Sequence, residues 1–125
     1  MPAPSISALP FFVYPVSDMA RARDFYRDVL GLQESWSWED RWVEFDVGGG
    51  TLALSTMMEG CIPGARGGAA ALETPDLAAM VAHLKAHGVT FLLEPVDTGV
   101  CTFARFTDCE GNHLVLHRTH GRGSG

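Results

Sequence analysis

Residues 17–32, SDMARARDFYRDVLGL, and residues 75–89, PDLAAMVAHLKAHGV, are two versions of one pattern. In each stretch an aspartate, Asp18 or Asp76, precedes the helical segment, where its side chain can accept hydrogen bonds from the first backbone N–H groups. A glycine, Gly31 or Gly88, follows each helical segment and stops it, because glycine adopts the left-handed conformation after a helix without a Cβ clash. The offsets are 76 − 18 = 58 and 88 − 31 = 57 residues. The sequence therefore predicts a unit of about 57 residues that is used twice.

Short segments of alternating apolar and polar residues around each helix predict strands. In residues 41–47, RWVEFDV, alternate side chains lie on opposite faces, and the glycines at 48–50 turn the chain into a hairpin with residues 51–56. Further strands are expected at 10–16, 69–74, 89–95, 101–108 and 113–118, whereas residues 33–40 are expected to form a loop. We predict one α+β domain over residues 1–125. It contains two βαβββ modules, about 8–58 and 69–118, a linker at about 59–68, and a curved mixed sheet with a cleft.

Composition and charge argue against several classes of binding partner. The 125 residues suffice for one domain with a buried core. Nine basic and 15 acidic residues give a net charge of −6 without a basic stripe, which argues against nucleic-acid binding. No apolar run approaches the ~20 residues of a membrane span, and the first residues lack signal-peptide features, so we expect no membrane partner and a cytoplasmic location. Cys61, Cys101 and Cys109 are odd in number and widely spaced, which fits a reducing compartment.

Two segments carry a resemblance to a known family. Residues 16–32, VSDMARARDFYRDVLGL, resemble the opening motif of the vicinal oxygen chelate superfamily, which includes glyoxalase I, extradiol dioxygenases and bleomycin resistance proteins. Residues 106–118, FTDCEGNHLVLHR, resemble its closing D-x-x-G-N turn and last strand. The resemblance covers nearly the whole chain and implies the paired βαβββ fold. It does not by itself imply an activity, because one scaffold hosts unrelated functions.

The resemblance also implies four positions at which the enzymes of this superfamily bind a divalent metal. These positions correspond here to Phe11, Ala53, Ala69 and Val115. None of the four side chains is a carboxylate, imidazole or thiolate, the groups that bind such ions. A shift by one residue moves each position to the other sheet face but again gives mostly apolar side chains. We therefore expect no metal and no other cofactor.

Strand alternation predicts which side chains line the cleft. Residues 12, 14, 16, 43, 45, 47, 114 and 116 are expected to pack against the helices, and their neighbours to face the ligand. The predicted ligand-binding residues are Phe11, Trp36, Trp38, Trp42, Glu44, Ala53, Phe103, Arg105, His113, Val115 and His117, and Thr51, Ser55, Glu73 and Cys101 share their face. This aromatic, partly polar lining suits a small, flat organic molecule held by stacking and a few hydrogen bonds.

His117, Glu73 and Glu44 are the candidates for catalysis, although the catalytic residues are otherwise unknown. His113 and His117 lie roughly 13 Å apart at ~3.3 Å per residue, too far for easy joint ligation of one metal. Either histidine could act as an acid or base, or simply contact solvent or a neighbour. The two glutamates could bind a cation or a cationic ligand, or be solvated or paired with an arginine.

The sequence supports more than one class of function. The first is a metal-independent protein that binds a small organic molecule and forms a homodimer. The alternative is a metal-dependent lyase, isomerase or dioxygenase with a displaced metal site, for example Glu44, Glu73 and His117. A third is an interaction module without a small ligand. The tryptophans either stack on a ligand or pack in a dimer interface, since aromatic residues concentrate at both kinds of site.

Overall fold

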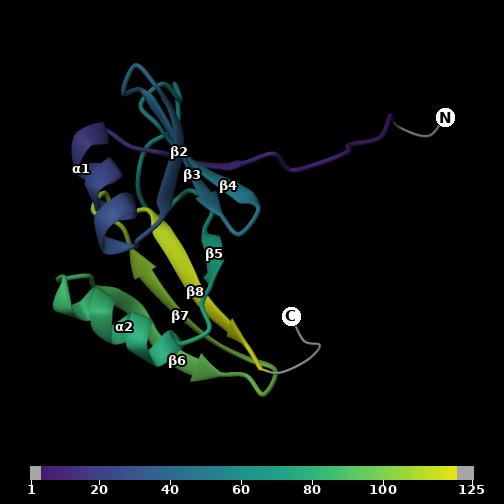
Figure 1. Ribbon diagram of the computed structural model, residues 1–125, viewed down its shortest axis with the longest axis vertical. Helices are drawn as coiled ribbons and strands as arrows, with labels where there is room; N and C mark the ends of the chain where they lie inside the picture. The colour runs from purple at the N-terminus through teal and green to yellow at the C-terminus, as the bar shows by residue number, and fades with distance from the viewer. Residues whose placement is uncertain (1–3, 121–125) are drawn as a thin grey trace.

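The protein is described by a computed structural model over residues 4–120, which fold into the two predicted modules (Figure 1). The first module contains β1 (Phe12–Pro15), α1 (Met19–Asp24), the π-helical turn η1 (Phe25–Val29), β2 (Gln33–Trp38), β3 (Trp42–Val47) and β4 (Gly50–Ser55). The second contains β5 (Ala70–Glu73), α2 (Leu77–Ala86), β6 (Phe91–Asp97), β7 (Cys101–Thr107) and β8 (His113–Thr119). The element order is that of two βαβββ repeats.

Each module forms its own four-stranded mixed sheet, with strand orders β1-β4-β3-β2 and β5-β8-β7-β6. In each sheet the first strand of the module pairs in parallel with the last, and the other pairs are antiparallel. β1 and β5 are edge strands, and the Tyr14 hydroxyl connects them by accepting a hydrogen bond from the Ala70 N–H at 2.7 Å. The curved surface is therefore made of two sheets joined by side chains.

The helix ends confirm the repeat read from the sequence. Asp18 accepts a hydrogen bond from the Arg21 N–H at 3.1 Å, and Asp76 accepts one from the Ala79 N–H at 3.0 Å. The glycines that follow the helices have φ angles of +76° at Gly31 and +82° at Gly88, a region that favours glycine. Both helices therefore begin and end as their sequences predict.

The hydrophobic core lies between the helices and one face of each sheet, and Figure 1 shows both helices on the same side of the molecule. The alternation predicted from the sequence is confirmed. The core-facing residues Tyr14, Val16, Val43, Phe45, Leu114 and Leu116 are buried, and Phe12 and Val47 are half-buried against them. The opposite face of each sheet is consequently free of helices, and we call the two together the open face.

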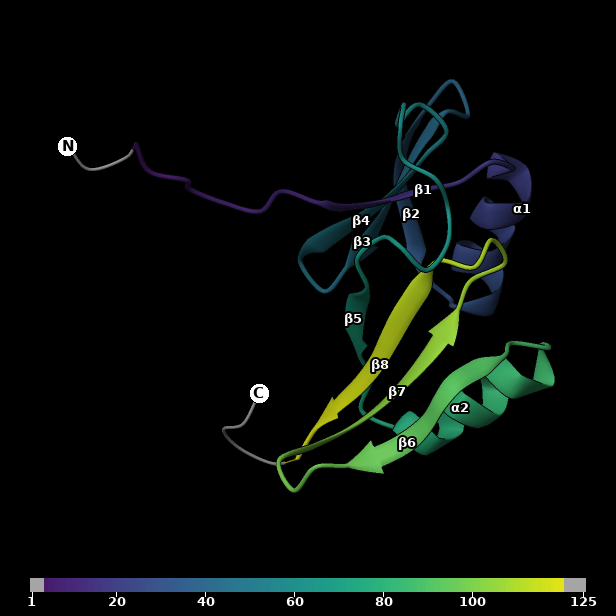
Figure 2. The same ribbon diagram turned by 180° about the vertical axis from the view of Figure 1, so that it is seen from behind.

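Two local predictions were wrong. The expected loop at residues 33–40 contains β2, which pairs with β3 and carries a bulge between Glu34 and Trp36. Most β2 side chains are exposed, so the segment has no buried face and its sequence lacks a clear alternation. The first strand spans Phe12–Pro15 rather than 10–16, and residues 4–10 run away from the sheets as an extended arm (Figure 2).

Hydrogen bonds from the turn before β8 connect the second module to the first. The Glu110 carboxylate accepts from the Ser17 N–H and hydroxyl, both at 2.7 Å, and from the Asp18 N–H at 2.8 Å. It thereby caps α1 from the other module. Deeper in the core, the Tyr26 hydroxyl donates to the Asp108 carboxylate at 2.8 Å. These contacts fix the orientation of one sheet relative to the other.

Candidate functional site

Strand register places the predicted binding residues of the first module together on the open face. Glu44 of β3 pairs with Ala53 of β4 on one side and with Trp36 of β2 on the other, and Trp38 pairs with Trp42. Directly paired residues of antiparallel strands project from the same face of a sheet. The first sheet therefore presents all three tryptophans of the chain beside the Glu44 carboxylate.

This part of the open face exposes large aromatic side chains. The Phe11 and Trp42 rings meet edge to face with centroids 5.2 Å apart, and the Trp42 indole N–H donates to Glu44 Oε2 at 2.8 Å. Trp36 is 54% exposed, Trp38 43% and Phe11 38%. Clustered exposed aromatic groups mark interaction surfaces rather than ordinary protein surface. Ala53 lies on the same face but is fully buried, so in the single chain it offers no surface to a ligand.

The second sheet contributes the remaining predicted residues. On β7 and β8, Phe103 pairs with His117, Arg105 with Val115, and Thr107 with His113. Arg105 is exposed, and the other predicted residues of these strands are half-buried. The second part of the open face therefore combines an aromatic ring with a cationic side chain and two imidazoles.

Glu73 and His117 form the most organised polar group of the open face. They pair between the parallel strands β5 and β8, with Glu73 Oε1 2.6 Å from His117 Nδ1. The other carboxylate oxygen accepts from the Thr119 N–H at 2.7 Å. The hydrogen bond from Thr119, followed by that from His117, lowers the pKa of Glu73 below its ordinary value. The carboxylate is therefore ionised at neutral pH.

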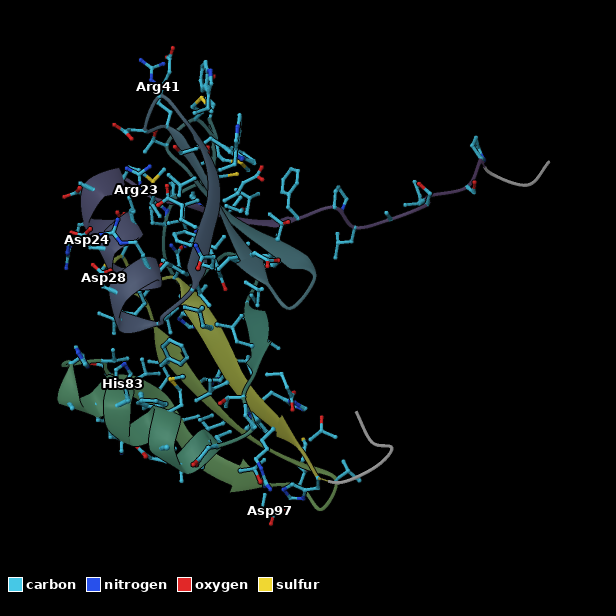
Figure 3. All side chains as sticks on the ribbon, viewed as in Figure 1. Arg23, Asp24, Asp28, Arg41, His83 and Asp97 are labelled. Atoms are coloured by element: carbon cyan, nitrogen blue, oxygen red, sulfur yellow. The ribbon has the colours of Figure 1, made fainter. Side chains whose placement is uncertain are left out.

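Within residues 4–120, neither Glu44 nor Glu73 forms an ion pair with an arginine. Glu44 accepts from Trp42, and Glu73 accepts from His117 and Thr119. Figure 3 shows Arg41 at the tip of the turn between β2 and β3, at the end of the molecule farthest from the second sheet. The cysteine on this face, Cys101, has its Sγ 3.3 Å from the Thr98 hydroxyl. The two carboxylates thus belong to separate sheets and separate hydrogen-bond groups.

The residues of the open face do not fit the metal that the superfamily's enzymes use. The four positions implied by the resemblance hold the side chains of Phe11, Ala53, Ala69 and Val115, which offer no ligand atom. Within residues 4–120, no three His, Cys, Asp or Glu side chains are placed to hold a metal ion together. This includes the displaced site considered from the sequence, Glu44, Glu73 and His117.

A cavity of about 440 Å³ lies beside β1, under the linker that joins the modules. Its lining combines the four residues of β1 with Met58, Gly60, Cys61, Ile62, Arg66, Gly67, Gly68 and Asn112. The Asn112 side-chain oxygen accepts from the Gly64 N–H at 2.9 Å and so holds the linker over this space. None of the predicted binding residues lines it. No sequence pattern predicted this cavity, because the glycine-rich linker that covers it has no periodicity.

Comparison with known proteins gives the following matches. The sequence pattern described as Glyoxalase/Bleomycin resistance protein/Dioxygenase superfamily matches residues 8–116. The antibiotic-binding protein TnmS3 from Streptomyces sp. CB03234 is 29% identical, with a TM-score of 0.78, over 94% of this chain and 100% of that one. A glyoxalase/bleomycin resistance protein from the same organism is 31% identical, with a TM-score of 0.74, over 85% and 96%.

A lactoylglutathione lyase from Agrobacterium tumefaciens shares the fold, with a TM-score of 0.71 and 19% identity over 90% of this chain and 94% of that one. Among curated proteins, none matches the sequence. Within residues 4–120, no helix is long and apolar enough to cross a membrane.

Proposed function

We propose that this chain, which belongs to the Glyoxalase/Bleomycin resistance protein/Dioxygenase superfamily, is a metal-independent protein that binds a small aromatic molecule on its open face. The observation that carries the proposal is the aromatic cluster formed by the exposed Trp36, Trp38 and Phe11 and the half-buried Trp42. Aromatic side chains supply a large contact area and stack on flat ligands. An antibiotic-binding protein among the similar structures supports the same class of function.

Metal independence is part of the proposal and rests on side-chain chemistry. The four positions that would ligate an ion are apolar, and the described residues contain no alternative group of three ligands. Binding energy must then come from stacking, burial of apolar area and a few hydrogen bonds. We expect purified protein to contain far less than one equivalent of Zn, Ni, Mn or Fe by elemental mass spectrometry. A stoichiometric ion would favour the lyase, isomerase or dioxygenase alternative.

Tryptophan fluorescence offers a direct test, because all three tryptophans of the chain lie on the open face. A panel of aromatic and peptide-like compounds is titrated against the protein, with N-acetyltryptophanamide as the control for optical absorption. We expect saturable quenching by at least one member of the panel. Trp42→Phe and Trp38→Phe variants identify which indole reports the contact. Linear, non-saturating responses to every compound would refute the proposal.

The proposal also includes a cytoplasmic homodimer that does not bind nucleic acid. Exposed aromatic side chains gather on the open face, and a second copy would cover part of them. The net charge of −6 disfavours a polyanionic partner. Light scattering after size-exclusion chromatography is expected to give twice the chain mass of 13.5 kDa. A monomer at all concentrations would remove the dimer from the proposal and leave the binding function standing.

A further inference from the structure

We infer that Glu73 and His117 form an acceptor for an ionisable hydroxyl group, so that the ligand of the open face is a phenol. This inference rests on the function proposed above and adds the chemical class of the ligand. Three features carry it: the fixed tautomer of His117, the free ring nitrogen that results, and the side chains that surround it on β7 and β8.

The tautomer follows from the hydrogen bonds of the Glu73 carboxylate. An ionised carboxylate only accepts hydrogen bonds, so His117 Nδ1, at 2.6 Å from Glu73 Oε1, must carry the proton. Glu73 itself is held in place because its second oxygen accepts from the Thr119 N–H at 2.7 Å. In the neutral imidazole the remaining nitrogen, Nε2, then has a free lone pair. Within residues 4–120, no side chain or backbone group donates a hydrogen bond to it.

The neighbours of His117 suit an aromatic ligand that carries a negative charge. Phe103 is directly opposite His117 on β7, and its half-buried ring is available for stacking. Arg105 pairs with Val115 and is therefore diagonal to His117, at the roughly 7–8 Å spacing that long side chains can bridge. Arg105 is exposed and forms no ion pair with another part of residues 4–120. An aromatic ring stacked on Phe103 would thus lie near one hydrogen-bond acceptor, His117 Nε2, and one cation, Arg105.

The chemistry is a hydrogen bond that can proceed to proton transfer. The ligand hydroxyl donates to Nε2, and for an acidic phenol the O–H bond breaks while an N–H bond forms. The resulting imidazolium stays paired with the Glu73 carboxylate, and the phenolate oxygen is stabilised by imidazolium and Arg105. A methyl ether of the same ring has no proton to donate and gains none of these interactions. The site should therefore distinguish a phenol from its ether.

The test uses para-nitrophenol and its methyl ether, para-nitroanisole, with binding measured by calorimetry. We expect wild-type protein to bind the phenol at least about tenfold more tightly than the ether, as a hydrogen bond involving charged groups implies. His117→Phe keeps a ring and Glu73→Ala removes the partner of Nδ1, so both variants should lose the preference. His87→Phe and Glu94→Ala alter exposed residues elsewhere and should keep it. Circular dichroism verifies that every variant is folded.

A second measurement needs no ligand. Nitrogen-15 correlation spectra of the histidine rings distinguish the two neutral tautomers, and we expect His117 to carry its proton on Nδ1. Glu73→Ala should abolish that preference, whereas Glu94→Ala should not. Glu73 acts here as a positioning residue, and a purely structural role for it would leave the tautomer unchanged.

The outcomes separate this inference from the proposed function. If the ether binds as tightly as the phenol, or if the preference survives in His117→Phe, the phenol inference is overturned while small-molecule binding stands. A His117 proton on Nε2 in the wild-type protein overturns it as well. If neither nitro compound binds and the whole aromatic panel fails to quench tryptophan fluorescence, both the inference and the proposed function are overturned.

Discussion

Tyr14→Phe is expected to destabilise the protein by removing a single hydroxyl that joins the two modules. The Tyr14 hydroxyl donates to the His113 carbonyl at 2.6 Å and accepts from the Ala70 N–H at 2.7 Å. Tyr14 is buried and its two partners are half-buried, so the substitution leaves a backbone donor and a backbone acceptor without a partner in a partly buried region. The remainder of the ring is unchanged, and the core packing is preserved.

The magnitude follows from the two lost hydrogen bonds. Each hydrogen bond contributes about 1 kcal/mol net, and each backbone group left without a partner adds a desolvation penalty. Together they should lower the free energy of unfolding by about 2–4 kcal/mol. Total stabilities of single domains are about 5–15 kcal/mol, so this is a large share. For a chain of this length the melting temperature should decrease by roughly 10 °C.

Urea unfolding followed by circular dichroism measures the difference in free energy. Ser35→Ala is the matched control, because its hydroxyl also donates to a backbone carbonyl, that of Glu44, but on the exposed strand β2. Its effect should remain within about 0.5 kcal/mol. If Tyr14→Phe lowers the free energy of unfolding by less than 1 kcal/mol, the hydroxyl is replaced by water and does not hold the modules together.

Three further outcomes are expected. Glu110→Ala should cost about 1–2 kcal/mol in urea unfolding, because it removes the carboxylate that accepts from Ser17 and Asp18 at the start of α1. Stability should decrease as the pH rises from about 10 towards 12, since burial raises the pKa of Tyr14 from 10.0 to about 12 and raises that of Tyr26, while the unfolded phenols ionise first. Tyr14→Phe should flatten this decrease in pH-dependent thermal melts. Dialysis against a chelator should leave the melting temperature unchanged in scanning calorimetry.

Local sequence signals predicted most of the fold. The capping aspartates, the glycines that end the helices and the alternation at Val43 and Phe45 each act within a few residues, and the structure confirms them. The strand β2 was missed because its side chains are exposed on both faces and no apolar periodicity marks it. Long-range contacts such as that between Tyr14 and Ala70, 56 positions apart, have no local pattern.

For the candidate site, strand alternation predicted only which face of the sheet each residue occupies. Alternation placed Trp42, Glu44 and His117 on the face away from the helices, as the strand register has them. It gave no partner for either glutamate, because pairing between strands depends on register across distant segments. The Glu73 to His117 contact spans 44 positions and requires the parallel pairing of β5 with β8. The binding role of these residues remains a prediction.

The two repeats differ in how the start of their helix is stabilised, because Glu110 of the second repeat caps the helix of the first. The turn between β3 and β4, which occupies the corresponding place in the first repeat, consists of glycines and offers no such carboxylate. The N–H of Asp76 instead lies 3.4 Å from the hydroxyl of Thr74, within its own repeat. A fragment holding only the first half would therefore keep the Asp18 cap but lose the contacts from Glu110, whereas the contacts at the start of the second helix come from its own half. Splitting the chain at the linker should therefore destabilise the first fragment more than the second.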